Sequence, residues 1–169
     1  MSGQVTSLAI LQCDSVTKSW VNSPPDCSSA SPSMAELWPP NHKMVDIGIV
    51  GVTDAEGDPI TIRILGITQD EPINGLGDGD TSPDGSGVGT STARVRSERS
   101  GGGNGRVYEI SFAASDGRGG ECRGSVKVCV PHDQGGGREC IDDGQAFDSV
   151  GALAPRTSRA SERGARNGM

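Results

Sequence analysis

Apolar and polar side chains alternate in five short segments between positions 45 and 130. A period of two residues is typical of a β-strand with one buried face and one solvated face. The positions that share one face are Val45, Ile47 and Ile49; Ile60, Ile62 and Ile64; Ala93, Val95 and Ser97; Tyr108, Ile110 and Phe112; and Val126, Val128 and Val130. The pattern predicts an all-β fold, a small antiparallel β-sandwich.

Segments rich in glycine and aspartate separate these strands and predict how they connect. Residues 53–59 (TDAEGDP) predict a hairpin between the first two strands, and residues 100–105 (SGGGNG) predict a second hairpin turn. Residues 116–120 (DGRGG) turn into the last strand. Residues 68–91 form a long Gly/Asp-rich loop, and a loop of this length is uncommon in a small domain unless it is functional or disordered.

The same patterns predict three parts of the chain. Residues 1–25 are a lead-in or the end of a preceding module, and the pair Pro24-Pro25 marks the boundary. Residues 26–133 are the sandwich. Residues 134–169 contain no alternating or helical pattern, so we expect a disordered tail or linker there.

The composition implies a thin core and an acidic surface. Hydrophobic residues make up 33% of the chain and aromatic residues 3%, so a Val/Ile core is expected to need reinforcement. The formal net charge of −7 argues against nucleic acid or an anionic membrane as the main partner. We also expect no membrane insertion, because no apolar stretch is long enough to span a bilayer.

Five cysteines show neither a C-x-x-C motif nor zinc spacing with the two histidines. In a thin-cored β domain they predict disulfides and an oxidising, extracellular or cell-surface location. No signal peptide is visible, so we expect the chain to be a fragment of a longer protein. The short flexible link from Cys129 to Cys140 allows these two to pair, but Cys13 competes for either partner, and the pairing stays open.

Acidic residues gather in three of the turns and are candidate calcium ligands, because Ca²⁺ prefers carboxylate and carbonyl oxygens. The candidates are Asp54, Glu56 and Asp58 in the first turn, Asp78, Asp80 and Asp84 in the long loop, and Asp116 in the third turn. We expect calcium, where bound, to order residues 68–91. The alternative is that aspartate and glycine are simply common in turns, and no EF-hand loop is present.

No catalytic constellation stands out. The chain has no G-x-S-x-G motif, and His42 and His132 are expected to be loop residues on the surface. Trp38 and Tyr108 could line a sugar-binding face, since aromatic rings stack on sugars. Packing in the core or at its ends is the alternative for both. The sequence therefore predicts a protein that is not an enzyme.

Several segments together resemble the immunoglobulin-like modules of large bacterial surface and secreted proteins, related in style to hyalin-repeat and cadherin-like domains. The resemblance covers residues 26–133, and its most specific parts are WPPNHK at 38–43, the D-x-x-G-D-P turn at 54–59 and the A-x-D-G-x-G-G turn at 114–120. It implies an immunoglobulin-like antiparallel β-sandwich. In the hyalin-type modules cysteines precede the first and the last strand, which implies a Cys27–Cys122 disulfide here.

The resemblance also implies a role and partners. Such modules act as spacers, adhesive elements or accessory domains, and some bind calcium at their acidic turns. This chain departs from their commonest turn in having Glu56 at the middle acidic position. We expect a non-catalytic structural or adhesion module whose partners are neighbouring modules and surface glycans or proteins. An accessory carbohydrate- or ligand-binding domain of an extracellular enzyme is the alternative.

Overall fold

The computed structural model describes residues 21–75, 77–79, 81–133 and 140–151, and these residues contain strands, turns and irregular segments but no helix. The strands are β1 (Ser31–Pro32), β2 (Met44–Ile47), β3 (Ile49–Val50), β4 (Thr61–Gln69), β5 (Gly85–Ser86), β6 (Ala93–Arg96), β7 (Arg106–Ser115), β8 (Glu121–Val130) and β9 (Phe147–Asp148). The all-β prediction is confirmed.

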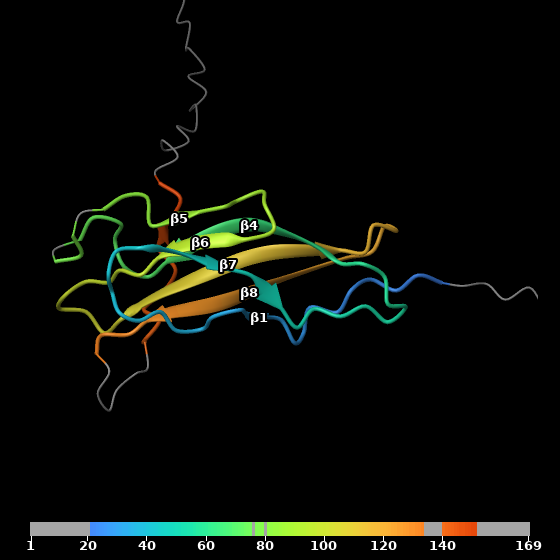
Figure 1. The fold of residues 1–169 in the computed structure, drawn as a ribbon, viewed down its shortest axis with the longest axis horizontal. Helices are drawn as coiled ribbons and strands as arrows, with labels where there is room; N and C mark the ends of the chain where they lie inside the picture. Colours follow the sequence, from blue (N-terminus) through green and yellow to red (C-terminus); the bar gives the residue numbers. More distant parts are fainter. Residues whose placement is uncertain (1–20, 76, 80, 134–139, 152–169) are drawn as a thin grey trace, which may run out of the picture.

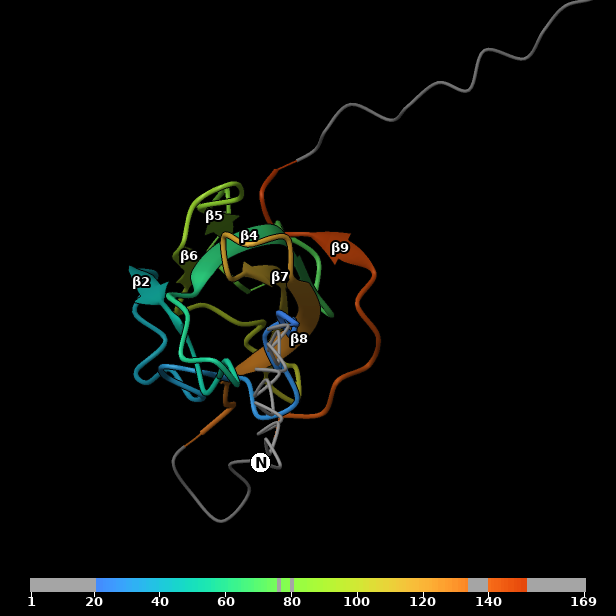
Figure 2. The same cartoon turned by 90° about the vertical axis from the view of Figure 1, so that its right-hand side faces the viewer.

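The strands form two packed layers. One layer is a sheet of order β8-β7-β4-β9, and the other is a sheet of order β2-β6-β5 beside the pair β1-β3. All pairings between these strands are antiparallel. Figure 1 shows the long strands β4, β7 and β8 running the length of the molecule, and Figure 2 shows β2, β6 and β5 on one side of them. The predicted antiparallel sandwich is therefore present.

The core lies between the layers, and β7 contributes most to it. This strand is paired on both sides, with β4 and β8, and its residues Tyr108, Ile110 and Phe112 are fully buried. Val126, Val128 and Val130 of β8 are buried at alternate positions, as their spacing predicted. Each layer thus supplies one apolar face, which is what the alternating pattern encodes.

Two predicted hairpins are wrong. The strand at Met44–Ile47 pairs with β6, whereas the strand at Thr61–Gln69 pairs with β7. Residues 100–105 likewise connect β6 of one sheet to β7 of the other. Both turns carry the chain from one layer to the other. Of the three predicted turns, only residues 116–120 join strands that are partners, β7 and β8.

The predicted loop at 68–91 is shorter than expected. Strand β4 continues to Gln69, and β5 at Gly85–Ser86 pairs with β6. The remaining connection of residues 70–84 lies with residues 97–105 at one end of the sandwich, and residues 53–59 and 116–120 lie at the other end (Figure 1).

The fold also extends beyond the predicted boundary at residue 133. Strand β9 pairs with the end of β4, where Gln69 lies opposite Phe147. Ser149, the residue after β9, is fully buried. Its N–H donates a hydrogen bond to the carbonyl of Ile67, and its carbonyl accepts one from the N–H of Gly85. Residues 140–151 therefore belong to the domain, although they had been assigned to a tail. The rest of that tail, and residues 1–20 of the lead-in, lie outside the described residues.

The segment before β2 connects both layers. β1 pairs with β3, and the chain then moves to the other sheet, where Glu36 forms a parallel bridge with Cys129 of β8. Leu37 follows at once, and its side chain is buried in the core. This change of sheet places Trp38 and residues 39–43 across one end of the sandwich.

Candidate functional site

A fully buried arginine, Arg106, lies at the centre of a charged cluster at the end of the sandwich that carries residues 70–84. Its Nη1 lies 2.7 Å from Oδ2 of Asp84, and its Nε lies 3.1 Å from Oε2 of Glu71. Its Nη2 lies 3.7 Å from Oδ2 of Asp78. The side chains of Arg106, Asp78 and Asp84 have no exposed area. One guanidinium therefore faces three carboxylates in a region that excludes water.

Strand register places Arg106 in the interior. Arg106 begins β7 and shares its inward face with Tyr108, because residues two apart on a strand point the same way. The guanidinium carbon lies 5.9 Å from the centre of the Tyr108 ring. Gln69, the last residue of β4, donates a hydrogen bond to Oδ2 of Asp84. Neighbouring ends of β4 and β7 thus supply the base of the cluster.

A second arginine extends the cluster toward the surface. Nε of Arg96 lies 3.7 Å from Oδ1 of Asp84 and 4.0 Å from Oε2 of Glu98. The same Glu98 oxygen lies 2.7 Å from Nδ1 of His42. Glu98 is fully buried, whereas the His42 side chain is half exposed. Basic and acidic side chains therefore alternate from His42 at the surface to Arg106 in the interior.

Burial governs the protonation of this cluster. It raises the pKa of Asp84 and the pKa of Glu98, because water no longer stabilises their ionised forms. Oδ1 of Asp84 and Oε1 of Glu98 are buried and have no hydrogen-bond partner among the described residues. Burial alone would lower the pKa of Arg106, but Tyr108 and the carboxylates beside it raise that pKa overall, so the guanidinium stays charged. The carboxylates, not the arginine, are the groups that pH can change.

The cluster fastens the long loop to the sandwich. Glu71, Asp78 and Asp84 all come from residues 70–84, and all three contact Arg106. Glu71 also accepts a hydrogen bond from the backbone N–H of Ser100, and Asp78 accepts one from the backbone N–H of Gly75. Glu71 and Asp78 therefore each contact the Arg106 guanidinium and also accept a hydrogen bond from a backbone N–H group.

This geometry changes the interpretation of the candidate calcium ligands in the loop. Asp78 and Asp84 are neutralised by a guanidinium, the kind of charge a metal ion was expected to supply. Asp80 lies outside the described residues. Two of the predicted calcium ligands in the loop thus contact the guanidinium of Arg106. Calcium binding in this loop stays a prediction.

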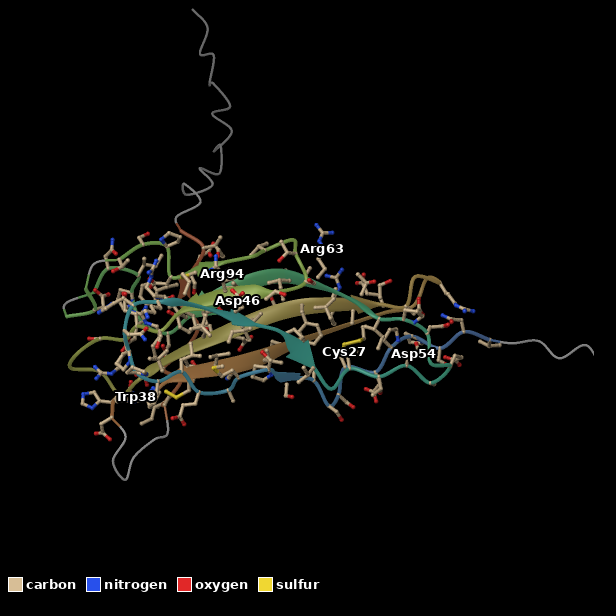
Figure 3. The ribbon with its side chains drawn as sticks, viewed as in Figure 1. Cys27, Trp38, Asp46, Asp54, Arg63 and Arg94 are labelled. Atoms are coloured by element: carbon tan, nitrogen blue, oxygen red, sulfur yellow. A yellow bond between two sulfur atoms is a disulfide. The ribbon has the colours of Figure 1, made fainter. Side chains whose placement is uncertain are left out.

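The acidic residues of the first turn lie at the opposite end, as the positions of Asp54 and Trp38 in Figure 3 show. Oδ1 of Asp54 accepts hydrogen bonds from the backbone N–H groups of Glu56 and Asp58. Oδ1 of Asp58 lies 2.7 Å from Nη2 of Arg118. Oδ2 of Asp54 and Oδ2 of Asp58 are buried without a hydrogen-bond partner among the described residues.

Asp116 closes the third turn onto the lead-in segment. Its Oδ2 accepts a hydrogen bond of 2.7 Å from Nδ2 of Asn22, and its Oδ1 accepts bonds from the backbone N–H groups of Arg118 and Gly120. These bonds, the one from Asn22 above all, lower the pKa of Asp116. Asp116 therefore stabilises a turn in its ionised form.

The arrangement does not fit a metal site. In the described part of the chain, no three aspartate, glutamate, histidine or cysteine side chains are placed to hold one ion. The first-turn and third-turn carboxylates mostly bind backbone N–H groups, and the loop carboxylates bind Arg106. Calcium binding at these turns therefore stays a prediction from the sequence.

Two disulfides cross-link the sandwich. Cys27 is bonded to Cys122, as the family resemblance implied, and Cys129 is bonded to Cys140. The first joins the segment before β1 to the start of β8, and the second joins the end of β8 to the segment before β9. Cys13, the competing partner, lies outside the described residues.

The two candidate sugar-binding aromatics are separated. Tyr108 is fully buried between the layers, so its assignment to a ligand-binding face is wrong. Trp38 keeps 39% of its surface exposed and lines a shallow recess of about 430 Å³. The alternation that placed Tyr108 beside Ile110 and Phe112 already indicated the core, whereas Trp38 stands outside any strand.

Sequence reasoning missed the residues that organise the cluster. Arg106 has the same parity as Tyr108 and Ile110, so the strand pattern could have assigned it to the buried face. Arg96 and Glu98 alternate with Val95 and Ser97, and the period of two alone would point both of them outward. Glu98 is buried because it follows the end of β6, where the alternation no longer applies.

Comparison with known proteins identifies no relative. No protein-family model matches the chain, and neither does any curated protein or solved structure. Within the described residues, no helix has the length and apolar character needed to cross a membrane.

Proposed function

We propose that this chain is a non-catalytic structural or adhesion module of a larger secreted or cell-surface protein, with an immunoglobulin-like sandwich. The strand order supports the fold assignment. The segment before β2 pairs with β3 at β1 and then, through Glu36, lies parallel to β8, the edge strand of the other sheet. Two packed antiparallel sheets are the architecture of such sandwiches.

The observation that carries the proposal is the pair of disulfides. Small domains with a thin core are cross-linked in oxidising compartments, and disulfides seldom persist in the cytosol. The Cys27–Cys122 bond spans 95 residues, which removes much of the conformational freedom of the unfolded chain. Cross-links at both ends of β8 favour a role in which the domain must keep its shape outside the cell.

The path of the chain suits a spacer among neighbouring modules. The first described segment, residues 21–30 (blue), lies at one end of the sandwich, and residues 140–151 (red) lie toward the other end (Figure 1). Both ends are held by polar contacts, Asn22 to Asp116 at one and the Arg106 cluster at the other.

Production of the chain in an oxidising and in a reducing compartment tests this proposal. We expect the oxidised protein to contain both disulfides by peptide mapping and to resist protease, and the reduced protein to be cleaved rapidly. A reduced chain that is as stable and as protease-resistant as the oxidised one would overturn the extracellular assignment.

An accessory ligand-binding domain is the second candidate function. The exposed ring of Trp38 in its recess favours it, because an aromatic ring that borders a recess offers a flat apolar face on which a ligand can stack. Glycans or proteins of a surface are the partners this candidate implies.

A further inference from the structure

The recess beside Trp38 follows the outer side of β2. Its lining combines apolar and polar side chains from the segment before β2, from β2 itself and from β6. The lining residues are Met34, Leu37, Trp38, Pro39, Asn41, Lys43, Met44, Val45, Asp46, Arg94 and Ser97. Figure 3 shows Trp38 at one end of the molecule and Asp46 with Arg94 farther along it.

The backbone around Trp38 is fixed on both sides. Leu37 is buried, and its N–H donates to the carbonyl of Cys129 on β8. The carbonyl of Pro39 accepts a hydrogen bond of 2.7 Å from the hydroxyl of Ser97. Trp38 is therefore presented on a supported backbone, and a pre-organised ring loses little conformational entropy when a ligand stacks on it.

Apolar surface surrounds the ring. Met34 is 47% exposed and lies with Met44 along the same recess. A flat aromatic ring with flexible thioethers beside it gives a dry platform that adapts to the C–H face of a ring-shaped ligand.

Polar side chains form the rest of the wall and carry a net positive charge. Nε of Arg94 lies 2.7 Å from Oδ1 of Asp46, so these two charges compensate each other. Lys43 has no ion-pair partner among the residues that the structure describes. In a chain of net charge −7, the recess thus keeps one uncompensated ammonium group.

We propose that this recess binds a uronic-acid unit of an acidic polysaccharide. The sugar ring stacks on Trp38, its hydroxyls bond to Asn41 and to the Asp46–Arg94 pair, and its carboxylate pairs with Lys43. A recess of about 430 Å³ falls within the range of small-ligand sites. This binding role goes beyond the structural one and does not depend on it.

Titration of the intact chain with a galacturonate trimer, followed through methionine methyl signals in NMR, tests the proposal. Met34 and Met44 line the recess, so their signals are expected to shift as trimer is added. The fully methyl-esterified trimer, which is neutral, is expected to bind about two- to fivefold more weakly, as for loss of one exposed ion pair. No shift of either signal, or equal affinity for the two trimers, would overturn the proposal.

Substitutions then assign the contacts. Trp38→Ala is expected to weaken binding by more than about tenfold, as for loss of a central aromatic contact. Lys43→Gln is expected to make the acidic and the neutral trimer bind equally. Arg63→Gln removes one positive charge from β4 far from the recess and is expected to change neither affinity (Figure 3). If Arg63→Gln weakened binding as much as Lys43→Gln, the charge effect would be non-specific and the site assignment wrong.

Discussion

Nη1 of Arg106 lies 2.7 Å from Oδ2 of Asp84, and both side chains are completely buried. The arginine begins strand β7, and the aspartate ends the long loop just before β5. Their contact joins the two sheets at one end of the sandwich. Since a buried charge is costly without a partner, each side chain requires the other for the loop to remain in place.

Replacing Arg106 should therefore be more damaging than replacing a surface arginine. We expect Arg106→Gln to lower the free energy of unfolding by about 3–5 kcal/mol, because it leaves Asp84 and Asp78 buried without a counter-charge. Arg63→Gln is the matched control, with an expected change within about 0.5 kcal/mol. Urea unfolding measures both. Equal effects of the two substitutions would show that the cluster does not hold the loop.

Stability should depend on pH in two directions. The pKa of Asp84 and that of Glu98 are raised in the folded state, so their contribution is present at low pH and is lost as pH rises through those values. The pKa of Asp116 and that of Asp142 are lowered, so their contribution is present above the unfolded values and is lost in acid. We expect the free energy of unfolding to rise from pH 7 toward about pH 5 and to fall below about pH 4.

Glu98→Gln provides the control for this pH dependence, because it removes one of the carboxyl groups whose pKa burial raises, and Asp70 and Asp84 remain. Its unfolding free energy should change less between neutral and mildly acidic pH than that of the wild type. A wild-type stability that decreases steadily from pH 7 downward would contradict the burial argument.

The two disulfides should differ in what they stabilise. Cys27 and Cys122 are 95 residues apart, and Cys129 and Cys140 are 11 apart. By chain entropy, removing the first should cost about 5 kcal/mol and removing the second about 3 kcal/mol. Denaturation of the paired Cys→Ala variants measures the order. Hydrogen exchange around β9 should accelerate only in the variant that lacks the Cys129–Cys140 bond. Acceleration around β9 in the variant that lacks only the Cys27–Cys122 bond would contradict the idea that Cys129–Cys140 holds β9 in place.

The contact between β5 and residues 146–149 leaves no room for a side chain at Gly85. An added Cβ would lie 2.9 Å from Cβ of Ser149 and 3.2 Å from Cγ2 of Ile67. We expect Gly85→Ala to destabilise the protein by about 1–3 kcal/mol through overpacking. Gly102→Ala is the control, because nothing lies within 4 Å of its added Cβ. Thermal unfolding compares the two variants. An unchanged unfolding temperature for Gly85→Ala would show that residues 146–149 move aside at little cost.

Removal of divalent cations should not loosen residues 70–84. Arg106 already supplies positive charge to Asp78 and Asp84, so a chelator is expected to leave hydrogen exchange in this loop unchanged. Arg106→Gln is expected to accelerate it. Faster exchange in wild-type protein after chelation, restored by calcium, would support the calcium-ordered loop that the sequence predicted.

Five strands could be predicted because alternation is a local property. Tyr108, Ile110 and Phe112 are buried wherever β7 pairs, so the pattern alone assigns them to the core. Strand partners depend on contacts between distant residues. Residues 53–59 and 100–105 have the composition of hairpin turns, yet both connect strands of different layers. Their composition does not distinguish a turn between paired strands from a connection between layers.

The candidate site was predictable only in part. The carboxylates at 78 and 84 were identified as functional, but their partner depends on the burial of Arg106 beside Tyr108. Strand β9 could not be predicted, since Phe147–Asp148 is too short to show a period. Its pairing with β4 arises from the Cys129–Cys140 bond and the close approach at Gly85.

Strand β9 also matters for how the protein is produced. A recombinant fragment that stops at residue 133 would leave the backbone of Thr68 and Gln69 without its neighbour and Cys129 with a free thiol. Uncovered strand edges recruit strands from other molecules, and free thiols then lock the resulting aggregates. Expression plasmids for this domain should therefore encode the chain at least to residue 151.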